Sequence, residues 1–131
     1  MAIKRKAKIK TEIGILLIIS TLFLLMLTPY QKLEIIYFRN DKCILTIQGD
    51  RTIEGVKEDF KNKVSITEIN VKMYPEDKPD TEEIKELRDK YNVFGVPVII
   101  INGKEFSRQL TKDNLENEIC NKFIIKPEVC Q

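Results

Sequence analysis

The sequence predicts a mixed α/β domain with the element order β-α-β-α-β-β-α, preceded by one apolar segment near the N-terminus. Three observations lead to this prediction. Short apolar, β-branched runs typical of buried strands occur at residues 33–38, 64–71 and 98–101. Apolar residues at helical spacing lie between and after these runs, and an Asn-Gly pair marks a tight hairpin turn. The 131 residues suffice for one domain and an appendage.

The first strand and the first helix of the domain flank a polar turn. The run LEIIYF at residues 33–38 predicts the buried strand. A helical stripe follows, formed by Ile53, Val56 and Phe60. The helix begins either at Cys43 or at Asp50, because the β-branched residues and the glycine of CILTIQG weaken a helix over that stretch.

A second strand and a second helix come next. Residues 64–71 form the strand, and the following loop, KMYPEDKPD at residues 72–80, is predicted to be a solvated connection without a function of its own. Asp80 is predicted to cap the helix, with Glu83 three residues later completing a capping box. The helix then continues through Ile84, Leu87, Arg88 and Tyr91.

The last elements are a hairpin and a helix. Residues 98–101 predict a continuous apolar strand, and Asn102-Gly103 is a strong signal for the turn into the return strand, which begins with KEF. Thr111 is predicted to cap the final helix. The apolar positions of that helix recur every four residues, at Leu115, Ile119 and Phe123.

The apolar segment at residues 13–28, IGILLIISTLFLLMLT, carries no charged side chain. As a helix it spans about 24 Å at 1.5 Å per residue, slightly less than a hydrocarbon core of about 30 Å. Lys8 and Lys10 on one side and Tyr30 on the other would therefore have to reach the two headgroup layers. We predict an uncleaved transmembrane anchor over residues 13–29. The alternative is a cleaved signal peptide, although TPYQK offers no small-x-small cleavage site.

Charge is unevenly distributed along the chain and predicts its orientation. Residues 1–12 carry five basic side chains and one acidic one, whereas the remainder carries 17 basic and 19 acidic residues. The basic tip, residues 1–12, is therefore expected to be cytoplasmic, and residues 31–131 are expected outside, in a single-pass membrane protein. The slightly acidic body argues against nucleic-acid binding.

The chain contains three cysteines and no histidine. Outside the cytoplasm disulfides persist, so an odd count predicts one pair and one free thiol. Cys120 and Cys130 are close in sequence and are therefore the default pair. Their disulfide would hold residues 123–131 as a C-terminal extension and would leave Cys43 free. The absence of histidine excludes Ser–His and Cys–His catalysis. Three cysteines are also too few for an all-thiolate metal site, so no metal and no cofactor is expected.

The element order, together with VFGVPVIIINGK before the hairpin, resembles the thioredoxin-like superfamily. The resemblance covers residues 33–122, and we predict a thioredoxin-like domain over residues 31–122. It implies that this domain is a three-layer sandwich. It also implies a cis bond between Val96 and Pro97 beside the active-site cysteine, with Val96 offering main-chain groups to an extended substrate segment. An X–Pro bond is the one peptide bond for which a cis form has a small cost.

The superfamily's other signature is C-x-x-C at the start of the first helix. This chain places Cys43 on the first cysteine and Thr46 on the second, so it resembles the C-x-x-Ser proteins related to glutaredoxin and the isomerase-like and non-catalytic members. The Thr46 hydroxyl could donate a hydrogen bond to the Cys43 sulfur, and Lys42 and Arg39 are neighbouring cations. A thiol at a helix N-terminus ionises more readily, which would assist attack on a disulfide.

Three functional hypotheses follow. The first is a membrane-anchored protein that performs thiol–disulfide exchange or isomerisation through Cys43 on extracytoplasmic protein clients, or with a membrane redox partner. The second is a binding or assembly module in the membrane that keeps the fold and the groove but does no redox chemistry. The third pairs Cys43 with Cys120 or Cys130, which makes the sulfur structural or makes the tail the resolving partner. In all three hypotheses, membrane lipid is an expected partner of the N-terminal segment.

Overall fold

The computed structural model describes residues 14–23 and 32–131, and the chain divides into two compact units, residues 1–30 and 31–131. In the first unit, residues 14–23 are helical and most of their side chains are exposed. Neither this segment nor any helix in residues 32–131 is both long and apolar enough to cross a membrane. The basic tip and the remaining residues of the predicted anchor, 13 and 24–29, lie outside the described residues.

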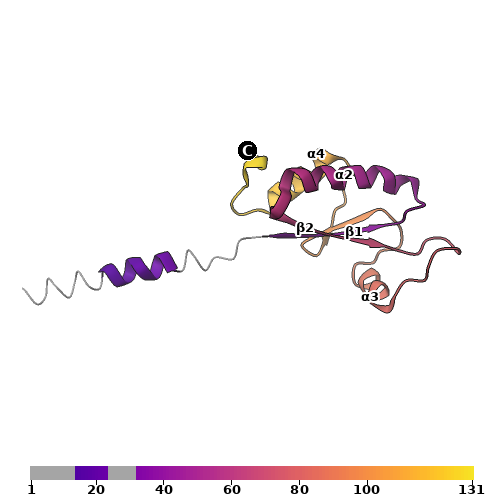
Figure 1. Cartoon of the computed structure of the whole chain (residues 1–131), viewed down its shortest axis with the longest axis horizontal. Coiled ribbons are helices and arrows are strands. Elements are labelled where there is room, and N and C mark those ends of the chain that lie inside the picture. Colours follow the sequence, from indigo (N-terminus) through magenta and orange to yellow (C-terminus); the bar gives the residue numbers. More distant parts are fainter. Residues whose placement is uncertain (1–13, 24–31) are drawn as a thin grey trace, which may run out of the picture. The chain divides into compact units, whose positions relative to one another are not determined.

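The second unit has the predicted element order (Figure 1). Its elements are β1 (Leu33–Arg39), α2 (Ile44–Phe60), the short 3₁₀ helix η1 (Lys61–Lys63), β2 (Val64–Asn70), α3 (Glu82–Lys90), β3 (Val98–Ile101), β4 (Lys104–Glu105), α4 (Lys112–Lys122) and a second 3₁₀ helix, η2 (Glu128–Cys130). The apolar, β-branched runs thus become strands, and the segments of helical periodicity become helices.

The strands form one mixed sheet in the order β2-β1-β3-β4. Strands β1 and β2 are parallel, with Leu33 opposite Val64, and β3 is antiparallel to β1. The hairpin from β3 to β4 turns at Asn102 and Gly103, whose φ angles of 46° and 79° are those that an Asn-Gly turn supplies. Strand β1 is therefore central, and its ends define the two ends of the domain.

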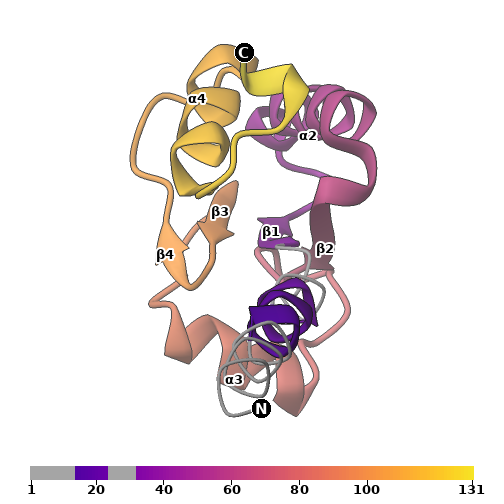
Figure 2. The ribbon, with the colours of Figure 1, turned by 90° about the vertical axis from the view of Figure 1, so that its left-hand side faces the viewer.

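Each face of the sheet carries its own apolar core. Alternate residues of β1 pack on α2 and α4, in a core that includes Leu33, Ile35, Ile53, Phe60, Leu115 and Ile119. The other face of β1 packs on α3, in a core that includes Ile36, Phe38, Val71, Val93 and Ile100. Figure 2 shows α2 and α4 above the sheet and α3 below it. The domain is a three-layer sandwich, as the resemblance implied.

The caps of the two later helices differ in how well they were predicted. Thr111 caps α4 by accepting a hydrogen bond from the Asn114 N–H, as expected. The prediction that Asp80 caps α3 is wrong, because Thr81 holds that position and accepts from the Ile84 N–H. The Asp80 carboxylate is engaged elsewhere: it accepts from the Arg88 guanidinium at 2.6 Å and from the Lys72 N–H at 2.6 Å.

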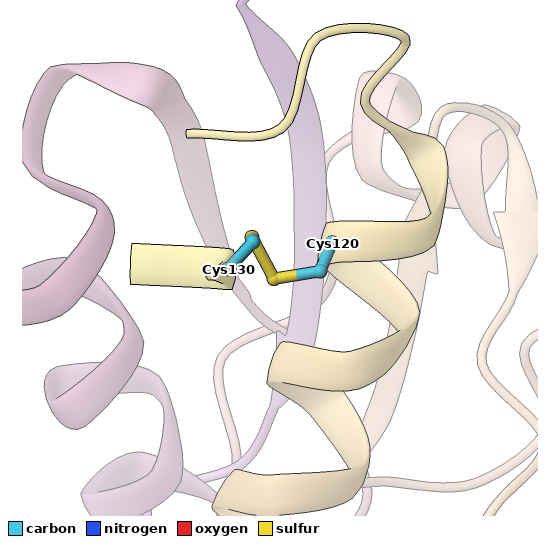
Figure 3. The surroundings of a disulfide bond; sticks show 2 residues. All are labelled: Cys120 and Cys130. Carbon is cyan, nitrogen blue, oxygen red and sulfur yellow. A yellow bond between two sulfur atoms is a disulfide. The ribbon is translucent and has the colours of Figure 1, made fainter. Parts of the chain in front are cut away.

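The C-terminal residues fold back on α4 and are covalently attached to it. Cys120, in the last turn of α4, forms a disulfide with Cys130 in η2, with a Cα–Cα distance of 5.6 Å (Figure 3). The predicted pairing is present in the structure and leaves Cys43 as the free thiol of residues 32–131. The pairing of Cys43 with either tail cysteine, which the third hypothesis required, does not occur.

Candidate active site

Helix α2 begins directly after Cys43. Cys43 is the N-cap residue, with extended φ and ψ of −82° and 120°. Its N–H donates to the Asn40 carbonyl at 3.0 Å, and its own carbonyl accepts from the Thr46 N–H at 3.0 Å. The structure therefore decides between the two predicted starts in favour of Cys43, and Asp50 lies in the second turn of the helix. The thiol stands at the end of α2 where the first backbone N–H groups have no intrahelical partner.

A partly buried polar network holds this poor helix-forming stretch in place. The Tyr37 hydroxyl, at the end of β1, donates to Asp50 Oδ1 at 3.1 Å or to the Thr46 carbonyl at 3.2 Å. The Arg39 guanidinium donates to both oxygens of Asp50, at 3.0 and 2.7 Å. Burial, with the Asp50 carboxylate beside it, raises the pKa of Tyr37, so the hydroxyl stays a donor at physiological pH. The network ties the second turn of α2 to the end of β1.

Thr46 supports the turn that carries the thiol. Its side chain is buried, and its Oγ1 lies 3.4 Å from the Asn40 N–H, which donates to it. The expected hydrogen bond from the Thr46 hydroxyl to the Cys43 sulfur is not formed within residues 32–131, because the hydroxyl faces the backbone of the turn. Thr46 is thus a positioning residue in this structure, and any further role in catalysis stays a prediction.

The cis proline lies beside the thiol. The Val96–Pro97 bond is cis, and the Cys43 Sγ donates a long hydrogen bond of 3.9 Å to the Val96 carbonyl. The two residues are 53 positions apart in the chain, and the fold brings them together because β3 starts at the end of the sheet where β1 stops. Cys43, Val96 and Pro97 form one site, as the resemblance implied.

Three apolar side chains that are close to Cys43 or Val96 in the chain are exposed to solvent. Ile44 is 78% exposed, Leu45 is 60% exposed and Phe94 is 86% exposed, so none of the three side chains belongs to either core. A shallow groove beside the cis proline is lined by Leu45, Gln48, Gly49, Pro97, Gln109 and Leu110. Sequence reasoning missed this surface. In VFGVP, two adjacent large apolar residues in a loop could have indicated it, because a single core rarely buries both.

The loop at residues 72–80 is an exposed connection, as predicted, but hydrogen bonds and an ion pair tie it to the active-site turn. That it has no function of its own stays a prediction. Asp77 Oδ2 accepts from the Asn40 side-chain amide at 2.8 Å and from the Met73 and Tyr74 N–H groups at 3.0 and 2.9 Å. Its Oδ1 pairs with Lys42 at 2.7 Å. The Lys42 ammonium, followed by the two backbone donors, holds the pKa of Asp77 well below its usual range. Asn40 and Asp77 are site residues that the sequence did not reveal.

The two predicted cations are therefore engaged by carboxylates. Lys42 pairs with Asp77, and Arg39 pairs with Asp50 and Asp41. Their effect on the thiol is offset by these partners, because an ion pair presents little net charge to a third group. In the ranges the structure describes, no three metal-ligating side chains are grouped as a metal site.

Replacing Asp77 with asparagine is expected to loosen the loop over the site at neutral pH. A carboxylate whose folded pKa is lowered contributes stability above its unfolded pKa of about 4 and loses it as the pH falls through the folded value. We expect the Met73 and Tyr74 amides to exchange hydrogen several-fold faster in Asp77→Asn than in the wild type at pH 7. This ratio should begin to fall below about pH 4 and should approach one only as the pH nears the folded-state pKa, well below that value.

The matched control for this experiment is Glu76→Gln. Glu76 also reaches Lys42, at 3.4 Å, but its side chain is 62% exposed and accepts no backbone N–H bond within the described part of the loop. Glu76→Gln should leave the two amides protected. Equal protection in Asp77→Asn and the wild type at pH 7 would show that the carboxylate does not hold the loop.

The parallel β1-α2-β2 unit, the antiparallel hairpin, the cysteine at the helix start and the opposing cis proline define a thioredoxin-like domain. Comparison with solved structures found similar folds. A structure described as a malarial protein superimposes with a TM-score of 0.53 at 14% identity, covering 72% of this chain and 99% of that one. This likeness concerns the fold alone.

Two thioredoxins are among the other similar structures. The germline-specific thioredoxin Deadhead of Drosophila melanogaster has a TM-score of 0.49 at 15% identity, covering 71% of this chain and 83% of its own. Thioredoxin 1 of the eubacterium Thermosipho africanus has a TM-score of 0.41 at 24% identity, covering 68% and 99%. Comparisons with protein-family models and with curated proteins found no match.

Proposed function

We propose that this chain is a membrane-anchored, extracytoplasmic thioredoxin-like protein that performs thiol–disulfide exchange or isomerisation on protein clients through Cys43. One observation carries the proposal: Cys43 is the N-cap residue of α2, is partly exposed, and has its free sulfur 3.9 Å from the Val96 carbonyl of the cis Val96–Pro97 bond.

The chemistry needs one cysteine and an external thiol. The Cys43 thiolate attacks one sulfur of a client disulfide, the client S–S bond breaks, and a Cys43–client disulfide forms while the second client sulfur leaves as a thiolate and takes up a proton. A different client thiolate then attacks the mixed disulfide and releases Cys43, so isomerisation transfers no net electrons. If a low-molecular-weight thiolate attacks the Cys43 sulfur instead, the client leaves fully reduced and Cys43 forms a mixed disulfide with that thiol. A second small thiolate then attacks this disulfide, releases Cys43 and leaves as the small-molecule disulfide.

Val96 is proposed to hold the client chain during this exchange. In the free protein its carbonyl accepts from the Cys43 thiol. When the sulfur enters a mixed disulfide it has no hydrogen to donate, so the Val96 carbonyl becomes available to a backbone N–H of the client. Pairing of this kind adds an extended segment to exposed main-chain groups. Formation of the covalent bond and docking of the client backbone would thus favour each other.

The location outside the cytoplasm is supported by two features. The uncharged run at residues 13–28 follows five basic residues, the arrangement of an anchor whose N-terminus stays in the cytoplasm. The Cys120–Cys130 disulfide suits an oxidising compartment, since cytosolic thiols are generally kept reduced. Membrane lipid is accordingly a proposed partner of the N-terminal segment.

The proposal is tested with the full-length oxidised chain in lipid vesicles and a client protein whose disulfides have been scrambled. Wild-type chain should restore native disulfides faster than an equal concentration of free cysteine, and acid quenching should trap a Cys43–client adduct. Cys43→Ser should abolish both. Thr46→Ala is the control for the turn: it should slow exchange several-fold through misplacement of the thiol without abolishing adduct formation. A wild-type rate no higher than that of free cysteine would overturn the proposal.

A redox-inactive binding module is the second candidate, favoured by the exposed Ile44, Leu45 and Phe94, which are close to the site residues in the chain. Such a surface binds apolar segments without using the sulfur. The two functions are separated by Cys43→Ser. Client binding that persists in Cys43→Ser, together with no exchange activity in the wild type, would support the binding module, whereas loss of exchange alone supports the enzyme.

A further inference from the structure

The loop that follows α4 exposes two adjacent isoleucines. Ile124 and Ile125 are 89% and 86% exposed, although Phe123 before them is buried in the core. The Cys120–Cys130 disulfide closes this loop, which places the pair on a short, covalently restrained segment (Figure 3). Large apolar side chains that a restrained loop keeps in contact with water indicate a surface that is covered in the functional state.

This pair lies at the end of the domain where the chain enters β1, which we call the entry end. Phe123 stacks on Phe60 with ring centroids 6.4 Å apart and planes 5° apart, so the end of α4 lies against the end of α2. From Phe60 the chain passes through η1 to Val64, which pairs with Leu33 at the start of β1. Figure 1 shows the loop after α4 and the start of β1 on the same side of the domain.

Lysines that are dispersed in the sequence gather at the entry end. Lys32 precedes β1 and Lys63 precedes β2, and the parallel pairing of Leu33 with Val64 places these two neighbours side by side. Lys61 in η1 and Lys126 beside the isoleucines are exposed. Glu34 and Glu128, which are next to this end in the chain, are also exposed and reduce its positive charge. An exposed apolar pair at the same end of a domain as several lysines is typical of a surface that binds anionic lipid.

The position of the anchor in the chain points to the same ligand. Lys32 is three residues beyond the predicted anchor at residues 13–29. Three extended residues span at most about 10 Å. An anchored chain therefore keeps the entry end within a short distance of the headgroups, where even weak attraction is sufficient because docking is intramolecular.

We propose that the entry end docks on the surface of the membrane in which the chain is anchored. Ile124 and Ile125 enter the boundary between headgroups and acyl chains, and Lys32, Lys61 and Lys126 contact anionic lipid phosphates. Docking fixes the height of the active site, because β1 runs seven residues, roughly 23 Å, from the entry end to the Cys43 turn. The thiol then faces away from the membrane, toward clients. This inference rests on the proposed anchor.

The experiment uses single tryptophans in the full-length chain, which contains none of its own. Ile125→Trp, Phe94→Trp and Leu22→Trp report on the entry end, the active-site end and the N-terminal helix. Each variant is reconstituted in vesicles of phosphatidylcholine and phosphatidylglycerol, with and without lipids brominated near the headgroup. We expect Ile125→Trp emission to shift to the blue and to fall roughly twofold, since an interfacial side chain lies about 5–10 Å deep. Leu22→Trp should be quenched, and Phe94→Trp should not.

The outcomes separate the docking from the anchor. Quenching of Leu22→Trp without quenching of Ile125→Trp would overturn docking and leave the anchor standing, and quenching of none would overturn both. Quenching of Phe94→Trp would show the opposite orientation. A blue shift of Ile125→Trp without quenching would assign the surface to a second protein copy instead. Quenching that is equally strong in pure phosphatidylcholine would overturn the role of the lysines.

Discussion

Gly49→Ala is expected to destabilise the domain by about 2–4 kcal/mol, although alanine is the better helix former. A Cβ at Gly49 would run into the Tyr37 hydroxyl, and would come within 3.2 Å of Leu110 Cδ2. Tyr37 is fully buried and its hydroxyl is held by Asp50 and Thr46, so the ring cannot move away without breaking these hydrogen bonds. Urea unfolding of the full chain, followed by circular dichroism, measures the change.

Gly55 provides the matched control within the same helix. A Cβ at Gly55 meets the Lys112 Cδ and Cε atoms at 3.1 Å, the end of a flexible side chain that can shift. Gly55→Ala should therefore be neutral or stabilise by up to about 1 kcal/mol. In a Tyr37→Phe background the cost of Gly49→Ala should shrink, because the hydroxyl that the new methyl meets is gone. Equal effects of the two alanines in the wild-type background would refute the proposed clash.

Removing the disulfide with Cys120→Ser and Cys130→Ser together should cost about 2–3 kcal/mol of unfolding free energy, on the chain-entropy model. The cross-link joins residues ten positions apart, and its absence returns that loop freedom to the unfolded chain. The isoleucine loop should also become mobile, since its attachment to α4 is lost. Denaturant unfolding of the wild type with and without a reductant measures the contribution of the disulfide to the free energy of unfolding. The reductant should have no effect on the double variant.

The same double variant tests whether the Cys120–Cys130 disulfide contributes to exchange at Cys43. The disulfide lies with Phe123 and Phe60 toward the entry end, whereas Cys43 lies at the other end of β1. Exchange by Cys43 in the folded double variant should therefore keep the wild-type rate. A large loss of exchange at full folding would instead mean that the tail cysteines take part in resolving the mixed disulfide.

Local sequence was sufficient to predict most of the architecture. The order of elements, the Asn102-Gly103 hairpin, the Thr111 cap and the Cys120–Cys130 pair all depend on residues close together in the chain, and all are present in the structure. Strand runs and helical periodicity report burial on one face, which the two cores then supply. Cys43 and the Val96–Pro97 pair were found through a resemblance rather than through periodicity.

The start of α2 was open in the sequence and was decided by contacts across the fold. CILTIQG is a poor helix by itself, and its helical state is held by Tyr37 and Arg39 on Asp50, 13 and 11 residues away. The same holds for the loop at residues 72–80, which Asp77 attaches to Asn40 across 37 residues. Turn chemistry in the sequence indicates a loop but not which distant donor its carboxylate meets.

The sequence by itself determined the order of strands and helices, the spare thiol and the short disulfide loop, because propensity, spacing and cysteine count act locally. Only the tertiary structure decided that α2 begins directly after Cys43 and that Thr46 faces the turn and not the sulfur, and it placed Val96 against the thiol as the resemblance implied. It also brought Lys32 and Lys63 together through the pairing of Leu33 with Val64, and left Ile124 and Ile125 exposed. These features join residues that are distant in the chain, and the packing of strands and helices alone brings them together.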